Sequence, residues 1–278
     1  MGNGSECFGY DDEISQDHDW GADFFLWLTE ADRESAAALS DWKWKLFKQH
    51  PPAFVRKTSA YGAKIGVMTC AEFYAGLIGC PEGPKTMQEW YAAPEENFAL
   101  AVNGEVFIDG AGEFAATRKL LLGYFPEDLR RKRIAAKCMA VAQTGQYNLS
   151  RCLKRKDYVT ARIALARFTE NFIALVFLLN RVYRPYYKWA FKAMMELPVL
   201  GASAGELLGK MAATGGFDKN SVTAIKACIE SLCSMAAQEL RKQGLTSSTD
   251  SFFATLGEDV SLGIKDKALR CLPPQYDI

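Results

Sequence analysis

Residues 4–28 read GSECFGYDDEISQDHDWGADFFLWL, and the prediction of the fold starts from this stretch. Gly4-Ser5 is followed by eleven residues, then by Asp17-x-Asp19, then by the apolar run of residues 24–28. On an extended chain, two acids separated by one residue point their carboxylates to the same side. A hard divalent cation such as Mg²⁺ relieves their repulsion. A Gly-Ser turn offers backbone N–H groups and a hydroxyl to phosphate oxygens. The stretch therefore predicts a site for a metal and a triphosphate, and the plainer interpretation is an acidic N-terminal loop.

The charges of this 278-residue chain sum to zero but are unevenly distributed. Residues 1–50 hold eleven Asp and Glu against four Lys and Arg, whereas residues 118–192 hold four against seventeen. This asymmetry is typical of a site with a metal on one wall and a polyanion on the other, although two independently solvated surfaces would show it as well. The zero net charge argues against bulk nucleic-acid binding.

The eight cysteines lie along the whole chain without a C-x-x-C pair, which is typical of reduced, mostly buried thiols in a cytosolic protein. The first twenty residues are acidic and do not resemble a secretory signal. The longest apolar run, Phe172 to Leu179, is too short to span a bilayer. We therefore expect a soluble, cytoplasmic protein with no membrane partner.

The first part of the chain has the signals of mixed α/β structure. Strands are predicted over residues 19–28 and 63–69, and helices over the stretch from Thr29 to Pro51 and over residues 71–78. Residues 98–109 predict a β-hairpin, because Asn103-Gly104 supplies the positive φ angles of a tight turn between two apolar runs.

Beyond Glu113 the strand signals stop. Pro126-Glu127-Asp128 predicts the start of a helix. Further helices are expected over residues 158–183, in the stretch from Pro185 to Pro198, and over residues 221–242 and 251–260. The predicted class is α+β: a small mixed sheet with flanking helices over residues 1–120, followed by an all-α helical bundle over residues 121–278.

Gly-Ser followed by Asp-x-Asp resembles the signature of the polymerase-β-like nucleotidyltransferase superfamily. The chain is more similar still to an uncharacterised bacterial branch, a domain of unknown function related to antibiotic nucleotidyltransferases. The similarity runs from Gly4 to about Pro198 and includes NGEVFIDGAGEF, GQYNLSR and NRVYRPYYKW. Two features depart from the family pattern: only three residues precede Gly4-Ser5, where the family has an apolar segment, and His18 stands at a usually apolar position.

The resemblance implies roles for individual residues. Asp17 and Asp19 are the metal-binding carboxylates, and Gly4 and Ser5 grip the β and γ phosphates. The superfamily uses a third carboxylate as metal ligand or base. Asp109, at the end of the predicted strand, is the candidate and Glu105 the runner-up. A turn Asp before Gly110 is the competing interpretation of Asp109.

Basic residues of the second domain would neutralise charge on the phosphates. Asn148, Arg151 and Arg155 share one helical face, which is also compatible with a solvated surface. By their position in the resemblance, Asn180 and Lys188 reach the nucleotide or the acceptor. A lysine that lies over neighbouring aromatic rings is the plainer interpretation of Lys188.

The implied activity is Mg²⁺-dependent transfer of a nucleoside monophosphate, by default AMP from ATP, to a hydroxyl with release of pyrophosphate at a two-metal site. The sequence does not identify the acceptor, which is a small molecule, the end of a tRNA or a protein side chain. One alternative is a catalytically weak nucleotide-binding module, such as a regulator or a toxin-antitoxin component. Another is a protein whose helical bundle carries the function.

Overall fold

The computed structural model describes residues 1–16, 20–54 and 66–278. Its chain divides into two compact units, Met1–Tyr124 (unit 1) and Phe125–Ile278 (unit 2). The sequence places the domain boundary after residue 120, and the two units meet after Tyr124. Asp17 and Asp19 lie outside the described residues.

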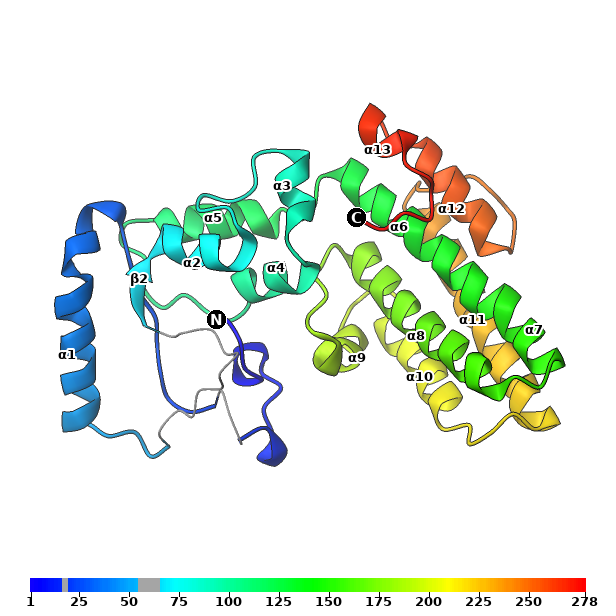
Figure 1. Ribbon diagram of the computed structural model, residues 1–278, viewed down its shortest axis with the longest axis horizontal. Helices are drawn as coiled ribbons and strands as arrows, with labels where there is room; N and C mark the ends of the chain where they lie inside the picture. Colours follow the sequence, from blue (N-terminus) through cyan, green and yellow to red (C-terminus); the bar gives the residue numbers. More distant parts are fainter. Residues whose placement is uncertain (17–19, 55–65) are drawn as a thin grey trace. The chain divides into compact units, whose positions relative to one another are not determined.

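Unit 1 combines short helices with a small sheet, which confirms the mixed α/β class (Figure 1). Within its described residues the sheet has two parallel strands, with Leu26 opposite Val67. The elements of unit 1 are η1 (Glu6–Phe8), η2 (Glu13–Gln16), β1 (Leu26–Leu28), η3 (Glu30–Ser35), α1 (Ala36–Gln49), β2 (Val67–Thr69), α2 (Cys70–Ile78), α3 (Met87–Ala92), α4 (Glu95–Val102) and α5 (Glu113–Leu122).

The start of α2 is encoded locally. Thr69 Oγ1 accepts a hydrogen bond from Glu72 N at 3.1 Å, and Glu72 Oε2 accepts one from Thr69 N at 2.9 Å. This reciprocal pair satisfies backbone donors that the first helical turn leaves unpaired. Gly79 ends the helix at a φ of 73°, a left-handed conformation that glycine adopts without a steric penalty. The same capping box, formed by Thr86 and Glu89, starts α3.

The predicted hairpin is wrong. Residues 98–102 belong to α4, and residues 105–109 form a loop. Phe98, Ala99 and Ala101 are buried, and Pro94 stands at the N-cap with two acids in the first helical turn. These start signals and the packing of α4 against α2 and α5 outweigh the local Asn-Gly turn preference.

An aromatic cluster forms the core of unit 1. The Trp27 and Phe114 rings stack with centroids 3.9 Å apart, and Phe73 contacts both. Tyr74 is fully buried, and its hydroxyl donates to the carbonyl of Phe114 at 3.2 Å. These contacts fasten β1, α2 and α5 together, so the loop between α4 and α5 has a defined position beside β1.

Unit 2 is helical throughout its regular elements, and the predicted helices are confirmed with shifts of a few residues at their ends. Long helices α6, α8 and α11 pack with α12 to form its core (Figure 1). The elements are α6 (Glu127–Val141), a π-helix η4 (Ala142–Asn148), α7 (Leu149–Lys154), α8 (Tyr158–Asn180), α9 (Tyr187–Met195), α10 (Gly201–Ala212), α11 (Lys219–Lys242), α12 (Phe253–Leu262) and α13 (Lys267–Cys271).

Two buried cations of α6 brace unit 2. Arg130 donates to the carbonyl of Leu178 at 2.8 Å and also bonds Glu127 and Gln243. Lys132 donates to backbone carbonyls of residues 272–274. A buried charge is tolerated only where such partners replace water, so both residues tie α6 to segments that are distant in sequence.

Among the described residues, α8 is the one helix long and apolar enough to cross a membrane. More than half of its most apolar stretch, 56%, is buried, and it packs against α6, α7, α9 and α11. Its apolar character is therefore that of a core helix.

Candidate functional site

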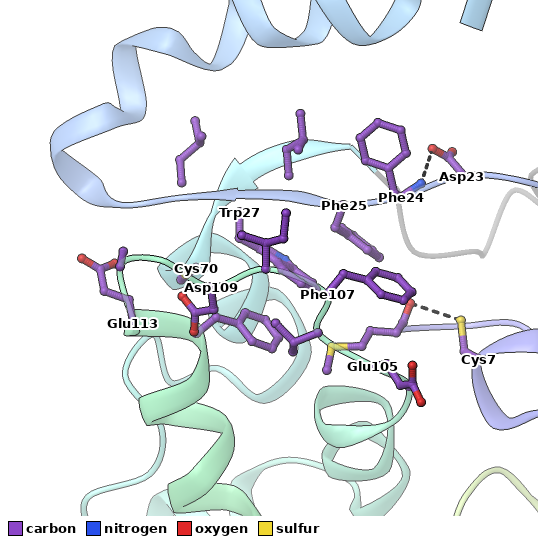
Figure 2. A pocket seen from close by; sticks show the side chains of 18 of the residues that line it. Cys7, Asp23, Phe24, Phe25, Trp27, Cys70, Glu105, Phe107, Asp109 and Glu113 are labelled. Atoms are coloured by element: carbon purple, nitrogen blue, oxygen red, sulfur yellow. Dashed lines mark hydrogen bonds between the residues drawn. The ribbon is translucent and has the colours of Figure 1, made fainter. Parts of the chain in front are cut away.

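A cavity of about 810 Å³ opens in unit 1 beside β1 (Figure 2). Residues 21–29 form one wall and residues 104–111 form another. The N-terminal segment contributes Glu6 and Cys7, while Cys70 and Glu113 come from the first turns of α2 and α5. Segments far apart in the sequence therefore meet at one hollow.

The cavity is acidic. Its described lining carries five carboxylates and neither Lys nor Arg: Glu6, Asp23, Glu105, Asp109 and Glu113. Carboxylate oxygens are the ligands that Mg²⁺ prefers. The lining therefore suits a hard cation, and an anion would bind there only together with one.

One of the five carboxylates already has a cationic partner inside unit 1. Asp23 lies 2.6 Å from the ammonium of Lys43, which is 8% exposed and also donates to the carbonyl of Phe24 at 2.7 Å. The same ammonium lies 4.9 Å from the centre of the Phe24 ring. This network fixes α1 to the start of the β1 segment, and it gives Asp23 a structural role.

Asp109 lies in the cavity lining, although the strand predicted to carry it is a loop. Its two carboxylate oxygens accept hydrogen bonds from the backbone N–H groups of Gly112, at 2.8 Å, and Ala115, at 2.7 Å. Asp109 therefore caps the start of α5, as the turn interpretation predicts. Each carboxylate oxygen has two acceptor positions, so these bonds leave capacity for a ligand.

Asp109, Glu113 and Cys70 gather at one end of the cavity (Figure 2). Burial, followed by the negative charges of Glu113 and Asp109, raises the pKa of the Cys70 thiol to about 11. A thiol with this pKa is uncharged at neutral pH, so Cys70 is neither a nucleophile nor a thiolate ligand there.

The remaining wall is aromatic. Phe24, Phe25 and Trp27 come from the β1 segment, Phe114 from α5, and Phe107 from the loop, where its side chain is 87% exposed. Apolar rings beside a few polar groups are typical of small-molecule sites.

Residues that follow Gly4-Ser5 and Asp17-x-Asp19 in the sequence line the cavity. Ser5 is buried at the start of η1, and its carbonyl accepts hydrogen bonds from Phe8 N and Tyr10 N. Gly4 and Ser5 are not lining residues, but the next two residues are. Residues 21–23, which line the cavity, follow Asp19 closely in the sequence.

The predicted nucleotide-binding residues of unit 2 have different surroundings. Arg151, in α7, is exposed, lies over the Tyr147 ring and donates to its hydroxyl. Lys188 is exposed, and its ammonium lies 5.0 Å from the centre of the Trp189 ring.

Asn180 differs from these two residues because its amide is engaged with the backbone. It donates to the carbonyls of Val176 and Val199, at 2.7 and 2.9 Å, and accepts from Val199 N at 2.9 Å. Asn148 ends η4, and Arg155 follows α7 as its C-cap.

The described part of the chain contains no group of three or more His, Cys, Asp and Glu side chains arranged to hold a metal ion. Asp17 and Asp19 are outside that part. The donor set nevertheless fits Mg²⁺ in kind, because the cavity contributes carboxylate oxygens.

Sequence analysis missed four of the polar residues at this site: Glu6, Asp23, Lys43 and Glu113. The sequence contained a weak indication that Asp23 belongs to the site, because this acid stands directly before the apolar run of β1. Glu113 is a first-turn acid, a common feature of helix starts that indicates no ligand. Only the packing of separate segments shows that these residues share a site.

Comparison with known proteins gives one match. Residues 90–190 match a domain of unknown function (DUF4037). The matched range contains Glu105, Asp109, Arg151, Asn180 and Lys188. Neither the curated proteins nor the solved structures contain a match to the chain.

Proposed function

We propose that this chain is a cytoplasmic, Mg²⁺-dependent nucleotidyltransferase with a nucleotidyltransferase-type α/β unit. It transfers a nucleoside monophosphate, AMP from ATP by default, to a hydroxyl acceptor and releases pyrophosphate. One observation carries the proposal: Asp109 lies in an acidic cavity that is also lined by Glu6 and Cys7, next to Gly4-Ser5, and by residues 21–23, which begin two positions after Asp19.

In this proposal Asp17, Asp19 and Asp109 hold Mg²⁺, which when bound neutralises phosphate charge and lowers the pKa of the attacking hydroxyl. A bond forms between the acceptor oxygen and the α-phosphorus, and the bond from that phosphorus to pyrophosphate breaks. The hydroxyl proton passes to a carboxylate, for which Asp109 and Glu105 are the candidates.

Arg151 and Lys188 are the better candidates for neutralising the phosphates, because their charged groups are exposed. Asn180 has its amide bonded to the backbone.

The second candidate function is a nucleotide-binding module without turnover. The capping role of Asp109 favours it, because both oxygens of a residue proposed for catalysis already accept backbone hydrogen bonds.

Calorimetric titration of ATP, with Mg²⁺ and then with a chelator, tests the proposal. We expect metal-dependent binding that weakens at least about tenfold in Asp17→Asn and in Asp109→Asn, which is roughly the 1.4 kcal/mol that one charge-assisted contact supplies. Asp41→Asn is the control, because Asp41 is exposed on α1. Glu105→Gln is a second cavity variant that does not disturb the cap of α5.

The outcomes separate the candidates. Binding followed by pyrophosphate release with a panel of hydroxyl compounds, tRNA and proteins supports the transferase. Binding without release from any acceptor supports the nucleotide-binding module. Absence of binding under both conditions contradicts both and leaves the helical bundle as the functional part.

A further inference from the structure

Helix α9 exposes an ordered row of aromatic and basic side chains. Tyr187, Phe191 and Met195 follow one another at four-residue intervals and are 70%, 39% and 43% exposed. Lys188 and Lys192, also four residues apart, form an exposed row beside them. Residues four apart are neighbours on a helix surface, so the two rows form one continuous patch.

The residue before the helix extends this patch. The Tyr186 ring is half exposed, and its centre lies 4.4 Å from the centre of the Tyr187 ring. We call the patch the α9 strip; its members are Tyr186, Tyr187, Lys188, Phe191, Lys192 and Met195.

The packed stripe of α9 lies directly beside the aromatic row, because Ala190 and Met194 stand three residues after Tyr187 and Phe191. Ala190 and Met194 are buried, and α9 lies against α8 and α10 (Figure 1). Met195 lies against Gly205 of α10, so the end of the strip helps to hold the helix, whereas Tyr187 is 70% exposed and Lys188 and Lys192 are exposed. A large apolar group exposed in this ordered way is typical of a binding surface.

Unit 2 as a whole carries a net positive charge. Residues 125–278 hold 23 Lys and Arg against 14 Asp and Glu, a net charge of +9. The helix itself carries two lysines and no acid between Tyr187 and Met195. One exposed acid, Glu196, follows Met195 directly, so the lysines exceed the acids by one over residues 187–196. A positive surface of this kind attracts a polyanion.

We propose that the α9 strip binds a single-stranded nucleic acid, whose bases stack on Tyr186, Tyr187 and Phe191 while its phosphates pair with Lys188 and Lys192. Exposed rings beside lysines are the combination that binds single strands without sequence preference.

Spacing also favours a single strand over a duplex. Four residues of helix separate Tyr187 and Phe191 by a rise of about 6 Å, whereas bases within a duplex strand are stacked at about 3.4 Å. Rings at the wider spacing suit bases that have left the stack. A duplex would offer its phosphates to the lysines but no open base face to the rings. The strip binds one strand locally, which is compatible with a chain of zero net charge.

Fluorescence anisotropy with labelled 12-nucleotide oligouridylate and oligothymidylate tests the proposal on the full chain, without Mg²⁺ or ATP. We expect binding of at least one strand, and weakening of about tenfold or more in the double variant Tyr187→Ala with Phe191→Ala, because each stacked base contributes substantially. In Lys188→Gln and in Lys192→Gln, the slope of log affinity against log salt falls by about 0.7. The ratio of the two affinities identifies RNA or DNA as the preferred strand.

Two variants serve as controls: Lys226→Gln on the exposed side of α11, and Tyr276→Ala, whose ring is 59% exposed. Both should leave the affinity unchanged. Far-UV circular dichroism confirms that every variant is folded. A duplex of the same length should bind more weakly than the single strands.

The proposal would be overturned if the wild type bound neither strand, or if it bound the duplex more tightly than the single strands. It would also be overturned if Lys226→Gln weakened binding as much as the strip variants do, or if the double variant without the two rings kept the wild-type affinity. Binding of phosphatidylserine vesicles in place of the strands, lost in the same ring variants, would assign the strip to a membrane surface. Because ATP and Mg²⁺ are absent, failure of this test and failure of the transferase proposal are independent.

Discussion

At the residue scale, Asn180 holds the end of α8 to the segment before α10. Its amide makes three hydrogen bonds to backbone groups of Val176 and Val199. Each such bond contributes about 0.5 to 1.5 kcal/mol, and an unpaired buried partner costs more. We expect Asn180→Ala to lower the free energy of unfolding by about 2 to 4 kcal/mol.

Urea unfolding followed by circular dichroism measures this change. Asn220→Ala, on the exposed start of α11, is the matched control and should change stability by less than about 0.5 kcal/mol. A stable Asn180→Ala variant that fails to bind ATP would instead give Asn180 a direct role in the site.

Cys70 reports the electrostatic field of the cavity. Its pKa is raised to about 11 by burial first and by Glu113 and Asp109 second. Because the folded protein holds this proton more tightly, the associated stability is present below the ordinary thiol pKa and is lost as the pH rises through about 11. We expect Glu113→Gln to shift the pH midpoint of Cys70 alkylation downward, since one of the charges that oppose the thiolate is gone.

Peptide mass mapping of alkylated protein at a series of pH values measures this midpoint. Cys271 is exposed, so its alkylation serves as the internal control and should not respond. An unchanged midpoint at Cys70 would mean that Glu113 does not face the thiol.

At the scale of elements, the π-helix η4 depends on Gly145. A Cβ at this position would lie 2.4 Å from Phe168 Cδ2 and 3.2 Å from Ile229 Cγ2. Both neighbours come from other helices of the core, so α8 and α11 pack directly on the glycine backbone. We expect Gly145→Ala to lower the free energy of unfolding by about 1 to 3 kcal/mol through overpacking.

Gly209→Ala, within α10, is the matched control for that substitution. A Cβ at Gly209 meets nothing within 4 Å, and alanine favours a helix over glycine by about 1 kcal/mol. Thermal unfolding should therefore place the two variants on opposite sides of the wild type. Equal melting temperatures would show that η4 adapts to the added methyl group.

The segment 98–109 shows why an element can be mispredicted. Asn103-Gly104 between apolar runs is a strong local signal for a hairpin. Gly104 does have a positive φ, of 63°, but it follows a helix. The apolar residues Phe98, Ala99 and Ala101 are as compatible with the buried face of a helix as with a strand. A short apolar run in a sequence does not distinguish these two structures.

At the scale of the whole molecule, unit 2 has the features of an independent folding unit. The partners of its buried cations Arg130 and Lys132 described above come from residues of the same unit. Its core consists of helices that contact one another. We expect residues 125–278, produced alone, to give a helical circular dichroism spectrum and one cooperative thermal transition.

The same measurement is made on the Arg130→Met variant of that fragment. This substitution replaces a buried charge by an apolar side chain, so it should alter the melting temperature without abolishing the transition. A broad, non-cooperative transition of the unaltered fragment would show that unit 2 requires the rest of the chain.

Several features of this protein follow from sequence alone. The helices that are predicted in unit 2 match the observed ones within a few residues, because apolar periodicity, Pro and first-turn acids act close to each helix end, whereas α10 and α13 are not predicted. The mixed α/β class of unit 1 and the acidic-to-basic change along the chain are readable in the same way. Asp109 was identified as a candidate, and it does line the cavity.

Tertiary structure decided the rest. The presence of Glu6, Asp23 and Asp109 in the lining of one cavity, and the pairing of Lys43 with Asp23, bring together segments that are distant in the sequence. No local pattern encodes such proximity, because it results from which apolar faces pack together. The same packing made residues 98–102 a helix and Asn180 a backbone clamp. Sequence therefore specified the local elements and the candidate chemistry, and long-range packing determined which of those groups share a site.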